Sequence, residues 1–205
     1  MRVIAVGCEY SGVSTLIEQL YQWGQAKGIH HHLDDHFTIP DAFHLSGEEQ
    51  QAMLHMLPAI KERFQRFQIV YHVRLLHRYN DILLGGFHIE EMIYGPKYYY
   101  PGIHIEIREY EPDMPDDTIL VHLHATPETI RARMAVAPHP HPLVPTEDVP
   151  QILERFEQEV GKSWIRRKFA INTTELTPAQ LLQTFLERSI PHLNPGDAAT
   201  RLLTR

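Results

Sequence analysis

The sequence predicts an α/β fold in which a mainly parallel sheet of about five strands is flanked by helices. Short β-branched or apolar runs alternate with longer helical patterns along the 205 residues. A glycine-rich turn joins the first apolar run to the first helical pattern. We expect one domain over residues 1–192 and a flexible tail over 193–205, because the last residues are mostly Gly, Asp, Ala, Thr and Arg.

The first half of the chain carries three strand patterns and two long helical stretches. A β-branched run ends at Gly7, a short apolar-polar run covers 29–33, and an apolar run suited to a buried strand covers 82–84. The first helix is expected over 16–25, where it closes near a glycine. A second helical stretch begins at Ser46, which has the spacing of a capping box, and its pattern continues to Arg78.

The second half repeats the alternation of strand and helix. A strong strand pattern covers 118–124, and Thr126 then caps a helix that has Pro127 at its first position. An amphipathic helix is expected over 146–160 and a short strand over 169–171. Thr177 caps the last predicted helix of the domain, which ends near Ile190.

The turn after the first strand has the spacing of a phosphate-binding loop, Gly-x-x-x-x-Gly-Lys-Ser/Thr, with one departure. Glycine allows the positive φ and the close backbone approach that phosphate needs, and the N–H groups of the loop and helix N-terminus then face the anion. The hydroxyl of Ser14 occupies the Mg²⁺-binding position. The candidate nucleotide-binding residues here are Gly7, Ser11, Gly12, Val13, Ser14 and Thr15.

The departure is Val13, which stands where the motif has its lysine. The lysine adds a full positive charge at the β and γ phosphates, and this chain lacks that charge. The alternative interpretation is an ordinary turn between strand and helix that contains two glycines. The position of the turn, directly after the first strand, favours the phosphate-binding interpretation.

The loop resembles that of bacterial thymidylate kinases and related nucleoside and nucleotide kinases, which carry an acidic residue at the position of Glu9. The resemblance implies a P-loop NTPase fold and a place for the Glu9 carboxylate near the acceptor nucleotide. It extends over most of the chain as scattered matches. In such kinases the strand at 82–84 is followed by Asp-Arg, whereas this chain has Gly85-Gly86. Glu90 and Glu91 follow and could supply a carboxylate in place of the missing Asp, but we expect solvated acids at a helix start.

Two acidic residues follow the second predicted strand. Ligands gather at the carboxyl ends of strands in α/β sheets, so Asp34 and Asp35 are well placed. By analogy with deoxynucleoside kinases, either could be the base that takes the proton from an attacking hydroxyl. A solvated acidic turn is the equal alternative.

The resemblance also assigns a lid and an adenine pocket. The Pro-rich segment after the 118–124 strand resembles the lid of nucleotide monophosphate kinases, here at about 134–148. Lid arginines in those enzymes hold donor phosphates, so Arg131 and Arg133 are candidates, with two solvated arginines as the alternative. Asn172 begins the segment that resembles the adenine-pocket loop. The basic turn 166–168 could face phosphate or solvent.

Composition excludes several other classes of protein. The net charge of −7 argues against nonspecific binding of nucleic-acid polymers. The single cysteine, Cys8, fits a reducing cytoplasm. The first residues lack a basic-then-apolar signal pattern, and the apolar runs are too short to span a membrane. The 15 histidines are scattered without metal-ligand spacing.

Together these features predict a kinase that transfers a phosphoryl group from ATP, with Mg²⁺, to a nucleoside or nucleotide. The partners are then small molecules, and the oligomeric state is open, with a homodimer as one expectation. The alternative is a catalytically degenerate nucleotide-binding or scaffold protein of the same fold. Val13, Gly85 and Gly86 favour that alternative, whereas Glu9, Ser14 and the two arginines favour the enzyme.

Overall fold

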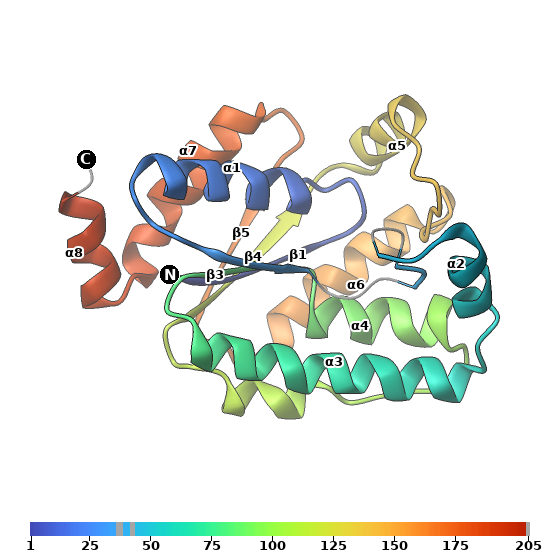
Figure 1. Ribbon diagram of the computed structural model, residues 1–205. Helices are drawn as coiled ribbons and strands as arrows, with labels where there is room; N and C mark the ends of the chain where they lie inside the picture. Colours follow the sequence, from blue (N-terminus) through green and yellow to red (C-terminus); the bar gives the residue numbers. More distant parts are fainter. Residues whose placement is uncertain (36–38, 42–43, 204–205) are drawn as a thin grey trace.

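The computed structural model describes residues 1–35, 39–41 and 44–203, with Asp35 and 201–203 described by backbone only. Its centre is a five-stranded, all-parallel sheet in the order β2-β3-β1-β4-β5 (Figure 1). The predicted α/β fold is confirmed. The strands are β1 Arg2–Gly7, β2 His32–Asp35, β3 Ile82–Gly85, β4 Thr118–His124 and β5 Arg167–Asn172.

The sheet is covered by helices on both faces, as an all-parallel sheet requires. Side chains alternate along β1, so that Ile4 and Val6 join one apolar core and Val3 and Ala5 join the other. Helices α1 Val13–Ala26 and α7 Pro178–Ser189 cover one face, whereas α3 Pro58–Arg78, α4 His88–Tyr94 and α6 Val149–Lys162 cover the opposite face (Figure 1).

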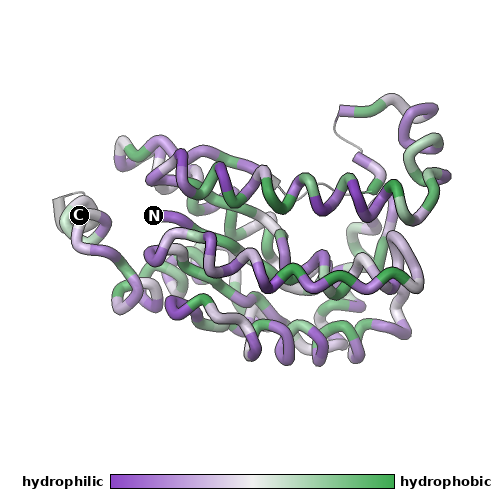
Figure 2. Tube along the Cα trace, turned by 90° about the horizontal axis from the view of Figure 1, so that it is seen from below, coloured by the Kyte–Doolittle hydropathy of each residue, from purple (hydrophilic) through white to green (hydrophobic). Residues whose placement is uncertain are grey.

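The remaining elements lie around the edges of this framework. Apolar and polar residues are interleaved along the helices in Figure 2, consistent with α3 burying Ile69, Val73 and Leu76 while Phe67 stays exposed. In the described residues, no helix is both long and apolar enough to cross a bilayer. The other elements are α2 Gly47–Leu54, the π-helix η1 Gly95–Tyr99, the 3₁₀ helices η2 Arg108–Asp113 and η3 Ile190–His192, α5 Pro127–Val136 and α8 Pro195–Leu203.

Two strands differ from their predicted limits. The strand expected over 29–33 lies at His32–Asp35, so Asp34 and Asp35 belong to β2 and do not follow it. The basic turn expected at 166–168 is partly strand, because β5 starts at Arg167. Lys168 Nζ donates to backbone carbonyls at the end of α6, including Ser163 O at 2.6 Å, and its charge there complements the carboxyl end of the helix.

The segment expected to be a flexible tail contains helix α8. Asn194 Oδ1 accepts a hydrogen bond from Asp197 N at 2.8 Å, and Pro195 begins the helix. Asp197 also pairs with the amino group of Met1 at 3.0 Å. A capping residue and a long-range ion pair therefore order residues whose composition alone predicts fraying.

Candidate functional site

The loop between β1 and α1 has the backbone geometry of an anion-binding turn. Gly12 has φ 102° and is the N-cap of α1, with no side-chain cap on the helix. The N–H groups of the first turn of α1 are therefore left for a ligand. A Cβ at Gly7 would collide with Leu123 O and with Ser11 Oγ, so both glycines are required. Ser11, within the loop, is fully buried.

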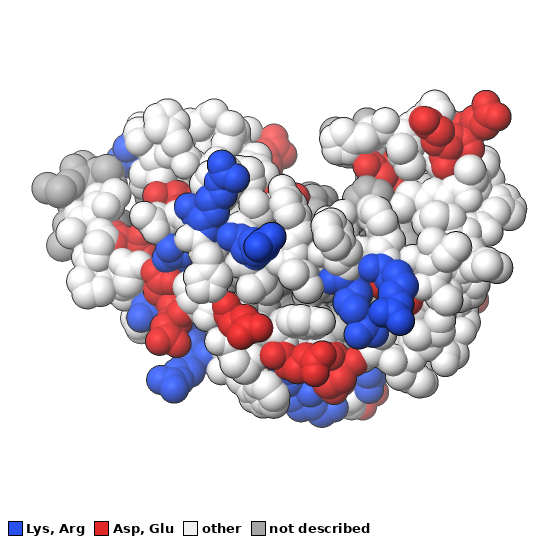
Figure 3. Space-filling view, turned by 60° about the horizontal axis from the view of Figure 1, so that its bottom comes forward, with Lys and Arg blue, Asp and Glu red and all other residues white. Residues whose placement is uncertain are grey.

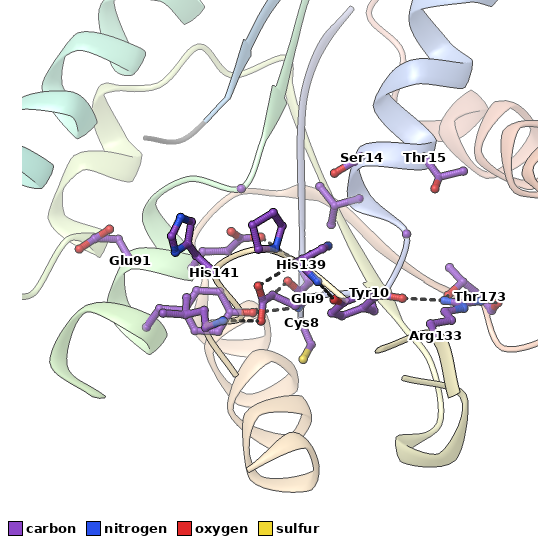
Figure 4. Close-up of a pocket in the computed structure, with 18 of the residues that line it drawn as sticks. Cys8, Glu9, Tyr10, Ser14, Thr15, Glu91, Arg133, His139, His141 and Thr173 are labelled. Carbon is purple, nitrogen blue, oxygen red and sulfur yellow. Dashed lines mark hydrogen bonds and ion pairs between the residues drawn. The ribbon is translucent and has the colours of Figure 1, made fainter. Parts of the chain in front are cut away.

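A cavity of about 600 Å³ opens over this loop at the carboxyl ends of the strands. Gly7, Glu9, Gly12, Val13, Ser14, Thr15 and Arg133 line it, so most of the predicted site residues come together. Ser11, Asp34, Arg131 and Asn172 are not among its lining residues. In Figure 4, Arg133 and Thr173 lie at one end and Glu91 and His141 at the other, with Glu9, Tyr10 and His139 between them.

The Arg133 end of the cavity is partly apolar. Leu176, Pro178 and Leu181 line it beside Thr173. Arg133 Nη1 donates to Tyr10 O at 2.8 Å, and its Nη2 donates to Thr173 O at 2.7 Å. Partial burial lowers the pKa of Arg133. The guanidinium therefore joins the glycine loop to the segment after β5.

The other predicted cations are held elsewhere. Lys97 Nζ pairs with Asp148 Oδ2 at 3.1 Å, and Arg131 Nε donates to Thr146 O at 3.3 Å. Arg167 Nε donates to Asp116 O at 3.0 Å, near the amino end of the sheet and far from the glycine loop. Among the described residues that line the cavity, Arg133 is thus the one Lys or Arg side chain.

Segment 137–148, between α5 and α6, forms a roof over the loop and lies within the lid predicted at 134–148. Glu9 Oε2 accepts hydrogen bonds from Leu143 N at 3.1 Å and Val144 N at 2.8 Å. Glu9 Oε1 lies 3.2 Å from His139 Nδ1. The acidic residue that we expected near an acceptor therefore binds the lid in this conformation.

Tyr10 and His141 add further lid contacts. The rings of Tyr10 and His139 stack with centroids 4.2 Å apart, and His139 N donates to Tyr10 Oη at 2.8 Å. His141 Nε2 lies 3.0 Å from Gln50 Oε1 of α2. The 137–148 segment thus bridges the glycine loop and α2, and it lines the cavity through His139, Pro140, His141 and Leu143.

The opposite end of the cavity is formed by α4. Glu90 and Glu91 line the cavity, and Glu91 is 1% exposed, so the expectation of two solvated acids is wrong for Glu91. Tyr100 Oη donates a short hydrogen bond to Glu91 Oε1. Gly7 N donates to Glu90 Oε1 at 3.3 Å. The position of α4 against the loop creates this arrangement, and a sequence pattern does not reveal it.

Asp34 lies beside two histidines at the sheet edge. Its Oδ1 is 3.3 Å from His72 Nε2, and its Oδ2 is 3.7 Å from His32 Nε2. The side chain of Asp35 is outside the described part of the structure. The base role of either aspartate stays a prediction.

At the end of β5, the cavity is lined by Thr173 and not by its predicted neighbour Asn172. Asn172 Oδ1 instead accepts hydrogen bonds from Thr174 N at 3.0 Å and from the Thr174 hydroxyl at 2.6 Å. Tyr94 and Tyr99 also line the cavity. In the sequence, Tyr94-Gly95 resembles the thymidylate kinase pattern after this strand, and the Tyr-rich segment around Tyr99 fits either a base clamp or a packed surface loop.

The charge of the cavity is dominated by carboxylates. Glu9, Glu90 and Glu91 line it against Arg133. Burial, with the nearby charge of Glu9, raises the pKa of the Cys8 thiol to about 12, so this thiol is protonated and unreactive at neutral pH. Outside the cavity, Lys and Arg side chains on the face in Figure 3 form small groups near acidic residues and no single basic surface.

The residues present fit Mg²⁺ in chemistry. Ser14, at the start of α1, lines the cavity and supplies a hydroxyl oxygen, a donor type that this hard cation accepts. The described residues contain no cluster of three or more His, Cys, Asp or Glu side chains arranged for a metal ion. A magnesium ion here would therefore depend on the phosphates of a bound nucleotide for most of its ligands.

Solved structures share this architecture at low sequence identity. The YorR protein of Bacillus subtilis, in complex with phosphorylated GDP, is 16% identical with a TM-score of 0.65, and the match covers 95% of this chain and 99% of that one. Deoxyadenosine kinase from M. mycoides, with the products dCMP and dCDP, is 11% identical with a TM-score of 0.64, over 92% and 98%.

Shikimate kinase from Bacteroides thetaiotaomicron is 14% identical with a TM-score of 0.54, over 92% of this chain and 96% of that one. No family model matches the sequence, and no curated protein matches it. The chain therefore has the fold of P-loop nucleoside and nucleotide kinases.

Proposed function

We propose that this protein transfers the γ-phosphoryl group of ATP to a small hydroxyl-bearing acceptor of the nucleoside or nucleotide class. The observation that carries the proposal is the glycine loop, with Gly12 at φ 102° and an uncapped α1, opening onto a lidded cavity. The fold shared with nucleoside and nucleotide kinases supports the same conclusion.

The two ends of the cavity suit two different ligands. The end with Thr173, Leu176 and Pro178 offers apolar surface and a backbone edge for a base. The loop N–H groups and Arg133 then hold the phosphates of the donor. The end near Glu91 and Tyr99 is left for the acceptor, so the phosphoryl group passes above the glycine loop.

Catalysis in this geometry depends on positioning and electrostatic stabilisation. The loop N–H groups would bind the phosphates, and Arg133, the one Lys or Arg among the described residues that line the cavity, would add a positive charge. Ser14 would be among the ligands of a bound Mg²⁺, and the ion would neutralise part of the phosphate charge. The lid is bound to the loop through Glu9 and Tyr10, and closure of the lid over bound ATP would limit its hydrolysis by water.

A second candidate function is nucleotide binding without turnover. Val13 removes the loop lysine, and Gly85-Gly86 removes the Asp-Arg pair of related kinases. The observation that favours this candidate is that Glu9 and Arg133 are both engaged in internal hydrogen bonds.

Calorimetric titration with ATP·Mg²⁺, ADP and a nucleoside panel tests the proposal, followed by a γ-phosphoryl transfer assay. We expect ATP to bind and at least one nucleoside or nucleotide to be phosphorylated. Binding without transfer would favour the second candidate. No binding of any nucleotide would contradict both.

A further inference from the structure

Helix α4 is held against the glycine loop by two side chains on one of its faces. Residues four apart lie on the same side of a helix, and Glu90 and Tyr94 have this spacing. Gly7 N donates to Glu90 Oε1 at 3.3 Å, and Glu9 N donates to Tyr94 Oη at 3.1 Å. Both ends of this helix face therefore contact the first residues of the loop.

The backbone before α4 is strained in a way that fixes the first turn of the helix. Gly86 has φ 70°. Phe87 has φ 136° and ψ −150°, a backbone region that residues other than glycine rarely adopt. Gly86 N still donates to Ala5 O at 2.8 Å, which ties this turn to β1. Phe87 is 1% exposed, and its packing holds the unusual conformation. Strain of this kind concentrates at functional sites.

The carboxylates of the cavity differ in what surrounds them. Glu9 Oε2 accepts two lid N–H groups and Glu9 Oε1 lies 3.2 Å from His139 Nδ1, so the lid engages both of its carboxylate oxygens. Glu91 is almost fully buried behind Tyr100. Glu90 is half-buried, lines the cavity, and lies beside the first glycine of the loop. Asp34 lies between His32 and His72 and does not line the cavity.

We propose that Glu90 is the catalytic base of the transfer reaction, receiving the proton of the acceptor hydroxyl from the first turn of α4. This inference rests on the proposed function. It places the base one strand away from Asp34 and Asp35, four residues after the Gly85-Gly86 that replaces the Asp-Arg pair of related kinases.

The step balances without a further reactant. The acceptor oxygen forms a bond to the γ-phosphorus of ATP, and the bond from that phosphorus to the β–γ bridging oxygen breaks. The electron pair of the broken bond stays on the β-phosphate of ADP. The hydroxyl proton moves to a carboxylate oxygen of Glu90, which releases it to solvent when the lid opens.

The test compares Glu90→Gln with Glu90→Ala in the full-length chain. Glutamine keeps an oxygen that can accept from Gly7 N but cannot act as the base, whereas alanine removes both properties. We expect both variants to lose about a hundredfold or more in kcat with a nucleoside that wild type phosphorylates, while ATP affinity stays within about threefold. Glu128→Gln, the same change in the exposed first turn of α5, is the matched control and should retain wild-type kcat.

The outcomes separate this inference from the function on which it rests. If Glu90→Gln keeps wild-type kcat and only Glu90→Ala is slow, Glu90 supports the loop and is not the base. If Asp35→Asn loses kcat and Glu90→Gln does not, the base is on β2. In both cases the kinase function stands. Absence of ATP binding or of transfer by wild type overturns the inference together with the function.

Discussion

The carboxylate of Glu9 accepts a hydrogen bond from Val144 N at 2.8 Å, and this contact joins the glycine loop to the lid. The two residues are far apart in the sequence: Glu9 belongs to the loop between β1 and α1, and Val144 belongs to the 137–148 segment above it. A charge-assisted hydrogen bond from the glycine loop itself therefore holds the 137–148 segment over the cavity.

Removing the Glu9 charge should release the lid. Charge-assisted hydrogen bonds contribute about 1.5–3 kcal/mol each, so Glu9→Ala should raise the exchange rate of the Leu143 and Val144 amide protons by about tenfold or more. Hydrogen exchange read by NMR or mass spectrometry is the measurement. Glu147→Gln, at an exposed site near the foot of the lid, is the control. Unchanged exchange in Glu9→Ala would mean that the lid is held by its other contacts.

Gly12→Val should abolish ATP binding. Valine is strongly disfavoured at φ 102°, and a bent loop cannot present its N–H groups to phosphate. Gly28→Val is the matched control, because Gly28 also has positive φ, at 72°, with open space around it and no place in the cavity. Both variants should lose some thermal stability, but calorimetry should show loss of ATP binding in Gly12→Val alone. If Gly12→Val binds ATP as tightly as wild type, the loop does not bind the phosphates of ATP.

Arg133 should compensate for the lysine that Val13 replaces. Neutralising it in Arg133→Gln should weaken ATP binding by about one to two orders of magnitude, since a charge-assisted contact contributes about 1.5–3 kcal/mol. The loss should be much smaller when Val13→Lys is also present, and a double-mutant cycle measures this coupling. Lys97→Gln and Arg131→Gln are controls that should have little effect, because neither residue lines the cavity. Strict additivity would show that Arg133 does not replace the lysine.

A nucleoside should bind better than its own 5′-monophosphate. Glu9, Glu90 and Glu91 line the cavity, and like charges about 10 Å apart repel by about 1.7 kcal/mol at an effective dielectric constant of about 20. We therefore expect at least about tenfold weaker binding of each monophosphate in competition titrations at low salt. Glu91→Gln should reduce the difference in affinity between a nucleoside and its 5′-monophosphate. Tighter binding of the monophosphates would identify a nucleotide acceptor and contradict this assignment.

Stability should fall as pH drops from about 6.5 toward 4. Burial lowers the pKa of His31 and of His122 to about 4, so the unfolded chain binds more protons than the folded chain in this window. Each histidine then contributes up to about 1.4 kcal/mol per pH unit to the slope, and the loss is complete below pH 4. Urea unfolding at a series of pH values between about 6.5 and 4 measures this change in the free energy of unfolding.

His122→Phe should reduce that slope, because the ring of His122 stacks on Phe156 and phenylalanine keeps this contact without titrating. His30→Gln, at an exposed position next to His31, is the control. An unchanged slope in His122→Phe would mean that the ring is not buried in its neutral form.

Local patterns predicted the sheet well. The strand expected over 118–124 is β4 itself, because its β-branched and apolar run is buried on both faces. β5 is longer than expected because the charged side chains of Arg167 and Lys168 reach backbone carbonyls while their backbones pair with β4. A charge pattern alone cannot show this.

The sequence predicted the cavity residues that are neighbours in the glycine loop. It did not predict the contacts that depend on how distant segments pack together. Gly7, Gly12 and Ser14 line the cavity as the loop motif predicts. Glu90 resembles an ordinary acid at a helix start, and its place in the cavity depends on how α4 packs against β1. The contact of Glu9 with Val144 likewise depends on a lid conformation that local sequence does not encode.

Val13 also determines how this protein responds to chemical labelling. ATP derivatives with an activated acyl phosphate tag nucleotide-binding proteins by acylating a lysine amine beside the terminal phosphate. None of the described residues that line the cavity is a lysine, and the ammonium group of Lys97 is paired with Asp148. Surveys that depend on such probes would leave this loop untagged even when it is fully occupied by ATP.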